Sequence, residues 1–407
     1  MSEPPRVRRV QEALDGFRPS RRTAVDEVAI EEALGRVPAL AVLAETALPG
    51  FARSAVDGYA VSAADTATAS RQTPAALEVI GTQRTGEPPR TELRPATAVA
   101  IPTGGALPGG ADAVVMVEDV APGPGESVVV SRAARPGQHV VGEDDDFAVG
   151  AVLVEAGRPI GARELAALSA AGIARISVRA RPRVAIISTG DEVVPPETAS
   201  LRPGQVRDAI APALAALVRQ ACGEPIRRGI VPDNESALEA ACREALRDCD
   251  MVVLSAGSSV GERDLTARVI ERLGPPGIWC HGLSMRPGRP TLLADVAGVP
   301  VIGLPGNPLS ALVVFELIGC PLVRRMAGFV HEPVRASTRA VLAQEVSSAL
   351  GRLDIVQVRL AEGEARPLPK GSALLSTLVR ADGQLVVPEE RVSVPAGEQV
   401  EIWLASQ

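Results

Sequence analysis

The feature that most constrains the fold is a regular alternation of apolar runs and helical patterns between Arg183 and Met326. The apolar runs predict strands at Val184–Ser188, Pro225–Val231, Met251–Leu254, Ile278–His281 and Val299–Leu304. The helical patterns follow these strands, at Ile210–Ala221, Ser236–Arg247, Leu265–Leu273 and Pro308–Arg325. Apolar strands that alternate with helices are typical of a largely parallel sheet covered on both faces. We therefore expect an α/β domain at residues 181–326.

Two of the predicted strands end in loops that suit an anionic ligand. In Leu304-Pro305-Gly306-Asn307-Pro308, Asn307 is a favoured helix N-cap and Pro308 a favoured first helical residue. The free N–H groups and positive dipole end of such a helix attract anions. The other loop is SAGSSVGERD, in which small residues let a ligand approach and hydroxyl groups can surround phosphate oxygens. Its candidate residues are Ser255, Gly257, Ser258, Ser259, Gly261 and Asp264.

A third loop, Thr189-Gly190-Asp191-Glu192, is acidic. Carboxylates alone would repel a phosphate, so acidic groups beside a phosphate site indicate a cation. In an open α/β sheet, ligands bind beyond the carboxyl ends of the strands. Three such loops in one segment therefore predict a binding site at that edge of the sheet.

Most of the remaining chain predicts β structure. Between Ala39 and Gly150, short apolar runs separated by Pro and Gly occur at Leu77–Ile80, Ala98–Ile101, Ala113–Val117 and Val128–Val130. After Met326, a small barrel or sandwich is expected, with strands at Ala340–Leu342, Ile355–Leu360, Leu385–Val387 and Val400–Leu404. Helices are predicted at Val25–Gly35 and Arg163–Ala171. Residues 1–22 are polar and are expected to be flexible.

Charge and hydropathy limit the classes of function. The chain has 407 residues, a net charge of −7 and no basic stripe, which argues against nucleic acid as a partner. No apolar run could span a membrane and no signal peptide is recognisable, so we expect a soluble cytoplasmic protein. The five cysteines form no CxxC pair and are not spaced with the three histidines. Buried structural thiols are therefore favoured over a zinc site.

Seven motifs, in this order, make the chain resemble the molybdopterin molybdenumtransferases, a family that includes the E domain of gephyrin. They are FARSAVDGYAV (51–61), IPTGGALPGGADAVVMVE (101–118), GED (142–144), STGDEV (188–193), LSAGSSVGERD (254–264), RPGRP (286–290) and LPGNP (304–308). The family inserts molybdate into adenylylated molybdopterin, so the resemblance implies this activity, with Mg²⁺-dependent release of AMP.

The resemblance also implies the domain organisation. We expect a discontinuous linker domain (23–45 and 151–180), a β-rich domain (46–150), the α/β molybdopterin-binding domain (181–326) and a C-terminal β-barrel (327–407). It implies a head-to-tail homodimer, with each active site between the α/β domain of one subunit and the β-rich domain of the other. An upstream molybdopterin adenylyltransferase and downstream molybdoenzymes are implied as further partners.

The resemblance assigns roles to single residues. The positions that match catalytic residues are Asp57, Asp191, Glu192 and Asp264, and three of them, Asp57, Asp191 and Asp264, are metal candidates. The further positions that match substrate-binding residues are Thr103, Asp144, Asp233, Pro305, Gly306, Asn307 and Pro308. Arg286 and Arg289 stand where the family usually has lysines that hold molybdate, and Pro287-Gly288 is expected to aim both cations at one point. Ser372 is a further candidate in the last domain.

Several departures from the family pattern bear on activity, among them Ala52, Arg53 and Val56, which stand where the family often has Asp, Asn and Met. Ala209 and Ile210 replace polar ligand contacts after Asp208, Ala256 replaces a loop glycine, and Gln357 stands where an arginine near the oxyanion is usual. These departures leave open a weakened paralogue or a scaffold of the gephyrin type. A molybdopterin adenylyltransferase is a second alternative, since its fold resembles residues 183–326 alone.

Overall fold

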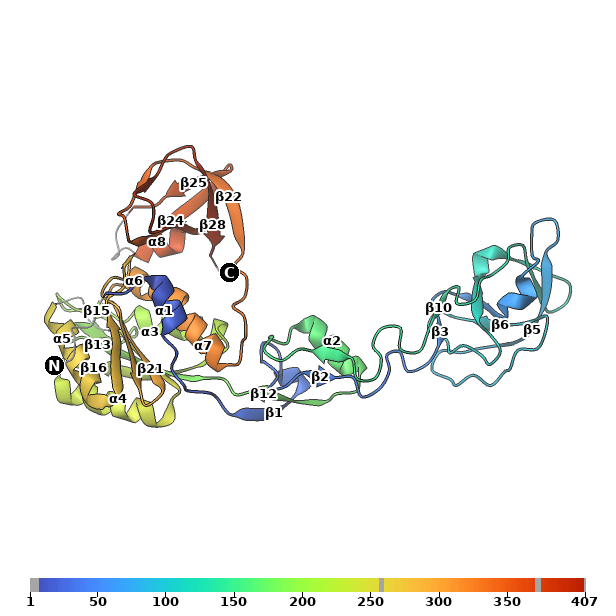
Figure 1. Cartoon of the computed structure of the whole chain (residues 1–407), viewed down its shortest axis with the longest axis horizontal. Coiled ribbons are helices and arrows are strands. Elements are labelled where there is room, and N and C mark those ends of the chain that lie inside the picture. The colour runs from blue at the N-terminus through green and yellow to red at the C-terminus, as the bar shows by residue number, and fades with distance from the viewer. Residues whose placement is uncertain (1–6, 256–259, 370–374, 406–407) are drawn as a thin grey trace.

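The computed structural model describes residues 7–255, 260–369 and 375–405, without the side chains of residues 260–264. Figure 1 shows an elongated molecule with an α/β unit and a barrel side by side at one end. A β-rich unit lies at the other end, and a slender linker built from two separate chain segments joins them. The predicted combination of an α/β sheet, a β-rich unit and a C-terminal barrel is confirmed.

The α/β unit is built on a six-stranded sheet. Its strands, in spatial order, are β16 (Glu224–Val231), β13 (Arg183–Thr189), β17 (Met251–Ser255), β21 (Val299–Leu304), β20 (Leu292–Val296) and β18 (Pro276–His281). The first four are parallel to one another, and β20 is antiparallel to both of its neighbours, β21 and β18, so it alone runs in the opposite direction. The sequence prediction missed β20, which forms a hairpin with β21 through the turn at Ala297 and Gly298.

Helices cover both faces of this sheet. One face carries α3 (Ile210–Gln220), α6 (Pro308–Val314) and α7 (Cys320–Met326), and the other carries α4 (Glu235–Asp248) and α5 (Val260–Leu273). Successive strand residues supply the two cores: Ile186 belongs to the first apolar cluster and Ile187 to the second. The single helix expected at Pro308–Arg325 is interrupted by a π-helical turn, Phe315–Gly319.

Within residues 7–22, the N-terminal segment is ordered where flexibility was expected. Helix α1 (Val10–Gly16) buries Val10 and Ala13, and Phe17 follows it into the core of the α/β unit. The polar composition of residues 1–22 concealed this, because three apolar residues at helical spacing suffice to dock a short helix on an existing core.

The linker contains a strand where a helix was expected. Residues Val25–Ala29 form β1, which pairs antiparallel with β12 (Arg175–Arg179), and only a short 3-10 turn, Ile30–Glu32, follows. Backbone pairing with a segment so distant in sequence overrides the local helical spacing of the apolar residues. The other linker elements are β2 (Val42–Leu43), β11 (Val152–Val154) and α2 (Ala162–Ala170), of which α2 confirms the helix expected at Arg163–Ala171.

The β-rich unit contains a mixed six-stranded sheet. Its strands, in spatial order, are β7 (Ala113–Met116), β4 (Gly58–Val61), β6 (Thr97–Ile101), β5 (Ala75–Thr82), β9 (Ser127–Val130) and β8 (Val120–Pro122). A small ladder joins β3 (Arg53–Ser54) to β10 (Val140–Val141). The four strands predicted from the sequence are all present.

The C-terminal unit is a closed barrel of five strands. Around the barrel they are β24 (Leu353–Ala361), β25 (Glu364–Pro367), β22 (Ser337–Leu342), β28 (Gln399–Leu404) and β26 (Gly383–Val387), which pairs back with β24. A strand of the α/β unit, β19 (Met285–Arg286), also pairs with β24. Helix α8 (Leu375–Arg380) contacts α6. The barrel and the α/β unit therefore share a sheet and a helix contact.

A buried polar contact joins the same two units. Glu316, in the π-helical turn, accepts a hydrogen bond from Gln384 Nε2 of the barrel at 3.1 Å. Burial raises the pKa of Glu316, whereas Gln384 and the nearby Arg335 oppose the rise.

Candidate functional site

The carboxyl ends of the parallel strands meet at one edge of the sheet, where several predicted site residues lie. Asp191 and Glu192 follow β13, and Asp233 follows β16 beside it. The two aspartates hold each other: Asp191 N–H donates to Asp233 Oδ2 (3.3 Å), and Asp233 N–H donates to Asp191 Oδ1 (3.2 Å). Ser255, at the end of β17, is buried, and its carbonyl accepts a hydrogen bond from Thr189 Oγ1 (3.1 Å). Two carboxylates are thus presented together on adjacent loops.

Asp208, which precedes Ala209 and Ile210, caps a helix. Its Oδ1 accepts hydrogen bonds from the N–H groups of Ile210 (3.1 Å) and Ala211 (3.0 Å), at the start of α3. Its Oδ2 accepts a hydrogen bond from Ser188 Oγ at 2.7 Å. The carboxylate is buried and engaged within the protein, so it holds α3 in place beside the site.

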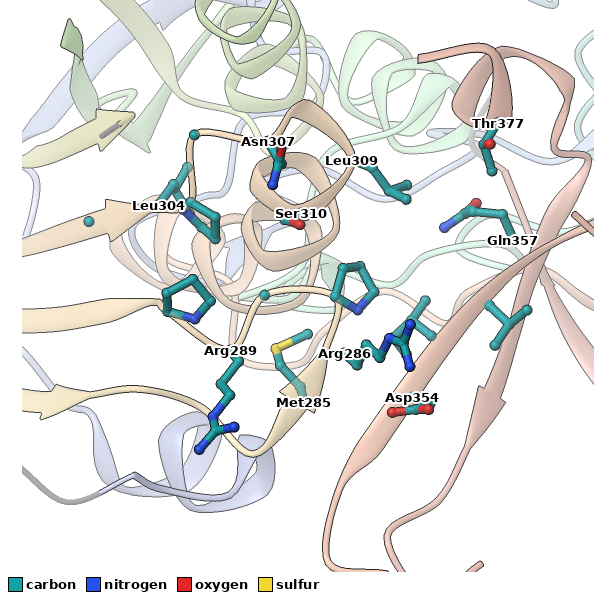
Figure 2. Close-up of a pocket in the computed structure, with 18 of the residues that line it drawn as sticks. Met285, Arg286, Arg289, Leu304, Asn307, Leu309, Ser310, Asp354, Gln357 and Thr377 are labelled. Carbon is teal, nitrogen blue, oxygen red and sulfur yellow. The ribbon is translucent and has the colours of Figure 1, made fainter. Parts of the chain in front are cut away.

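A cavity of about 320 Å³ lies between this edge of the sheet and the barrel. The LPGNP loop, the RPGRP turn and strand β24 of the barrel contribute its walls. Pro305, Gly306 and Asn307 line it together with Leu309 and Ser310 at the start of α6 (Figure 2). The pocket therefore needs both units.

The RPGRP turn brings two cations to this cavity. Arg286 and Arg289 both line it and are exposed. Figure 2 shows Arg286 on the barrel side, close to Asp354, and Arg289 on the other side of Met285. The expectation that the turn aims both cations at one point is therefore wrong. Gly288 between them has φ +110°, and a Cβ there would lie 2.3 Å from Val314 Cγ2, so the turn packs too closely on α6 for any side chain.

The barrel adds two buried polar groups to the cavity wall. Asp354 is 2% exposed and forms a bidentate pair with Arg352, at 2.7 and 2.9 Å. Gln357 is 6% exposed and lines the same cavity. Among the described residues, its Nε2 has no hydrogen-bond partner. A buried donor without a partner is costly, so the amide is suited to an acceptor supplied by a ligand.

Asp57 lies in the β-rich unit, at the far end of the molecule from this cavity (Figure 1). Its Oδ1 accepts hydrogen bonds from Thr103 N–H (2.6 Å) and Thr103 Oγ1 (2.9 Å). These bonds lower the pKa of Asp57, so the exposed carboxylate is kept ionised. Asp144, in the same unit, is exposed and has φ +66°. One chain therefore does not bring Asp57 and Thr103 together with Asp191.

Several predicted residues fall outside the described part of the structure. Gly257, Ser258, Ser259 and Ser372 are not described, nor is the side chain of Asp264, which belongs to helix α5 together with Gly261.

Within the described residues, no group of three or more His, Cys, Asp or Glu side chains could hold a metal ion. None of the described helices is long and apolar enough to cross a membrane.

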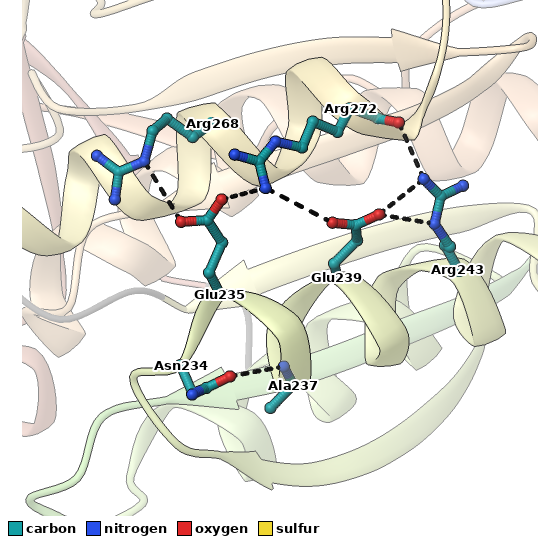
Figure 3. A network of polar contacts seen from close by, with 7 residues as sticks. All are labelled: Asn234, Glu235, Ala237, Glu239, Arg243, Arg268 and Arg272. Atoms are coloured by element: carbon teal, nitrogen blue, oxygen red, sulfur yellow. Dashed lines mark hydrogen bonds and ion pairs between the residues drawn. The ribbon is translucent and has the colours of Figure 1, made fainter.

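Helix α5 is held against α4 by a network of ion pairs (Figure 3). Glu235 pairs with Arg268 (3.6 Å) and with Arg272, while Glu239 accepts from Arg243 at 2.8 Å. Asn234 caps α4 through a hydrogen bond from Ala237 N–H (3.0 Å). These contacts lie along the part of α5 that follows Asp264, so they orient the helix that carries this residue.

Sequence reasoning missed Asp354 and its partner Arg352. The available signal was a polar residue within an otherwise apolar strand: β24 reads Leu-Asp-Ile-Val-Gln-Val, and both Asp354 and Gln357 are buried. Polar residues buried in a strand usually have a specific partner or a ligand.

Three family models match successive parts of this chain. The MoeA N-terminal region (domains I and II) matches residues 8–172, the probable molybdopterin binding domain matches residues 185–325, and the MoeA C-terminal region (domain IV) matches residues 339–405.

Known proteins resemble the chain over most of its length. Molybdopterin molybdenumtransferase 2 of Mycobacterium tuberculosis is 34% identical over 92% of this chain and 94% of its own length. A molybdopterin molybdenumtransferase of Haemophilus influenzae is 32% identical, over 93% of this chain and 94% of its own. The crystal structure of a molybdopterin biosynthesis MoeA protein from Pyrococcus horikoshii OT3 superposes with a TM-score of 0.85 at 30% identity. That match covers 98% of this chain and 100% of the other.

Proposed function

Because this chain belongs to the molybdopterin molybdenumtransferase family, we propose that it inserts molybdate into adenylylated molybdopterin and releases AMP. The observation that carries the proposal is the cavity of about 320 Å³ between the sheet edge and the barrel. It presents Arg286, Arg289 and the Nε2 group of Gln357, which has no hydrogen-bond partner among the described residues. The Arg286 guanidinium and the neutral Gln357 donor suit a tetrahedral oxyanion such as molybdate, and Arg289 adds positive charge at the same cavity.

The adenylylated substrate would lie along the carboxyl ends of β13, β17 and β21, next to this cavity. Loops at such strand ends bind phosphates through backbone N–H groups. The substrate reacts by attack of water on one phosphorus, and the bridging P–O bond breaks so that AMP leaves. Asp191 and Asp233 stand at the edge where the pyrophosphate would lie, and the ionised Asp57 would orient the attacking water or the cation.

The donors present suit Mg²⁺, which typically binds one or two carboxylates and completes its shell with substrate phosphates and water. Asp191, with Asp233 beside it, supplies such a pair of carboxylates. Asp57 and Asp264 are the other candidate ligands. When bound, Mg²⁺ would neutralise charge that develops on the phosphates.

We propose that the working form is a homodimer. Asp57 and Thr103 lie far from the cavity of their own chain, so a complete site requires these residues from a second copy. The linker exposes large apolar side chains that a partner could cover, namely Val25 (51%), Leu34 (57%), Leu40 (79%), Leu43 (47%) and Val152 (47%). Light scattering that found a fully active monomer would contradict this assembly.

Of the alternatives, the adenylyltransferase is not favoured, because the matches at residues 8–172 and 339–405 extend well beyond the α/β unit that such an enzyme resembles. A scaffold that binds the nucleotide without turning it over is distinguished by experiment.

The test is release of AMP, followed by chromatography, from adenylylated molybdopterin supplied with purified protein, Mg²⁺ and molybdate. We expect release that increases with molybdate and stops when Mg²⁺ is chelated. Binding of the nucleotide without AMP release would establish the scaffold instead. If omitting molybdate left both nucleotide binding and AMP release unchanged, the oxyanion would not be a substrate.

A further inference from the structure

The RPGRP turn is attached to a segment at the opposite end of the sequence. Arg8 lies beside Leu283 in a parallel bridge: Arg8 N–H donates to Gly282 O (3.1 Å), and Ser284 N–H donates to Arg8 O (2.8 Å). The pocket residues His281 and Met285 directly flank the segment Gly282–Ser284. The N-terminal segment therefore runs along the back of the cavity wall.

The attachment reaches Arg289 in one further step. Leu283 N–H donates to Arg289 O (2.9 Å), and Gly282 N–H donates to Thr291 O (2.8 Å), so the turn closes on the same residues that Arg8 holds. On the other side, Ser284 O accepts from Leu353 N–H of the barrel (3.0 Å), and Ser284 Oγ donates to Gly351 O (2.5 Å). The turn is thus fixed between the barrel and the N-terminal segment.

Side chains anchor this segment, residues 7–17, which we call the N-terminal clasp. The Arg8 guanidinium lies 4.3 Å from the ring centroid of Trp279 in β18, and Phe17 lies 5.6 Å from the same ring. Val10 and Ala13 are buried in the core. Arg9 forms an ion pair with Glu389 of the C-terminal unit at 3.3 Å. The clasp therefore contacts both units that form the cavity.

We infer that the N-terminal clasp positions the Arg286–Arg289 turn for the oxyanion, and that Arg8 is its positioning residue. The inference deepens the proposed function and rests on it for the identity of the anion. Arg8 does not line the cavity and acts through Leu283 and the backbone of Arg289. A turn with loosened backbone presents its cations less often in the binding geometry, which weakens anion binding and leaves the nucleotide loops unaffected.

The full-length chain offers a matched control. Arg21 also ties the N-terminal region to the α/β unit, through a 2.8 Å ion pair with Asp250. Asp250 precedes β17, at the edge of the sheet opposite the cavity. Arg21→Ala removes one positive charge and one anchoring contact, as Arg8→Ala does, but does so away from the turn.

The experiment compares Arg8→Ala, Arg8→Lys and Arg21→Ala in AMP release at varied molybdate and saturating nucleotide. For Arg8→Ala we expect the half-saturating molybdate concentration to rise roughly fivefold to tenfold, as loss of a partly desolvated cation–π contact would give. We expect kcat to stay within about twofold and the KM for the nucleotide to be unchanged. Arg8→Lys should restore most of the molybdate affinity, and Arg21→Ala should resemble the wild type even where its melting temperature falls as much.

A second measurement is independent of catalysis. Hydrogen exchange of the amides of residues 282–291 should accelerate in Arg8→Ala and not in Arg21→Ala. Equal exchange in the two variants, or an equal rise in half-saturating molybdate, would overturn the inference. A wild-type chain that ignores molybdate while Arg8→Ala alone shows faster exchange would remove the proposed function and leave the clasp standing.

Discussion

The two ends of this molecule present their candidate residues in opposite ways. At one end, the cavity lies between the sheet and the barrel, with Asp354 and Gln357 buried in its wall and the RPGRP turn fixed on two sides. At the other end, Asp57 is exposed at the surface of the β-rich unit, and among the described residues its carboxylate accepts hydrogen bonds only from Thr103. A binding pocket can be built within one chain, whereas an exposed carboxylate needs a second surface before it can act on a substrate.

The contrast between the two ends is tested most directly at Asp57. We expect Asp57→Asn to lower the single-turnover rate of AMP release by about 10²-fold, because the charge at the reacting phosphate is lost while the size of the side chain is kept. The fold should be unchanged by circular dichroism, since the residue is exposed. Asp65→Asn is the control, because Asp65 also accepts a backbone hydrogen bond, from Ala96 N–H at 2.9 Å. A folded Asp57→Asn variant with wild-type release would move the catalytic assignment to Asp191 or Asp264.

Subunit mixing tests whether a complete site takes its residues from the two ends of different chains. Asp57→Asn and Asp191→Asn should each be nearly inactive, and chains exchanged at equal amounts should recover roughly a quarter of wild-type activity. Half of the dimers are then mixed, and each mixed dimer keeps one intact site. The measurement is AMP release after refolding of the two variants together, with each variant refolded alone as the control. A mixture as inactive as its components would place both residues in the same site of one chain.

The end that holds the cavity is tested through its cations. Arg286→Ala should raise the half-saturating molybdate concentration about tenfold, the loss of one charge-assisted hydrogen bond, with a smaller effect on nucleotide binding. Titration of each ligand separately by calorimetry checks this. Arg84→Ala, in the β-rich unit, is a suitable control because Arg84 is exposed and pairs only loosely with Glu87, at 3.9 Å. Equal weakening of both ligands would show that Arg286 does not discriminate between them.

The smallest expected effect concerns the joint between the barrel and the α/β unit. Because burial raises the pKa of Glu316, the native state binds its proton more tightly than the unfolded state does. The stability that this group contributes is complete below its unfolded pKa and is lost as the pH rises through its folded pKa. Glu316→Gln should therefore match the wild type near pH 4 and melt about 2 °C higher at pH 8. A calorimetric melting temperature that matches near pH 4 but is lower for the variant at pH 8 would show that the carboxylate stabilises the joint when charged.

The sequence allowed the prediction of elements that carry their own pattern. Strands β13, β17 and β21 are mostly apolar and helix α4 has apolar residues at helical spacing, so local signals located them. Strand β1 was mistaken for a helix because its partner β12 is far along the chain, and no local signal reports such a pairing. Helix α1 was missed because its stability comes from the core on which it packs.

The site residues, too, could be predicted where a local signal marks them and not where tertiary contacts bring them together. The loops at Asp191 and Asn307 were predicted because they follow buried strands directly, and the family resemblance added Asp57 and Asp233. The contact of Asp191 with Asp233 and the entry of Asp354 into the cavity depend on which strands are neighbours. That information resides in the tertiary packing and not in the spacing of residues along the chain.

Strand β19 of the α/β unit, which pairs with strand β24 of the barrel, also sets the order in which the protein can be completed during synthesis. Met285 and Arg286 find their sheet partners only at Leu353 and Asp354, and the barrel closes only when Gln399–Leu404 takes its place between β22 and β26. A nascent chain can fold its six-stranded sheet earlier, since all strands of that sheet lie before residue 305. The cavity wall is therefore among the last parts to form on the ribosome, and an unfinished chain has the loops of the site but not the barrel wall that completes the cavity.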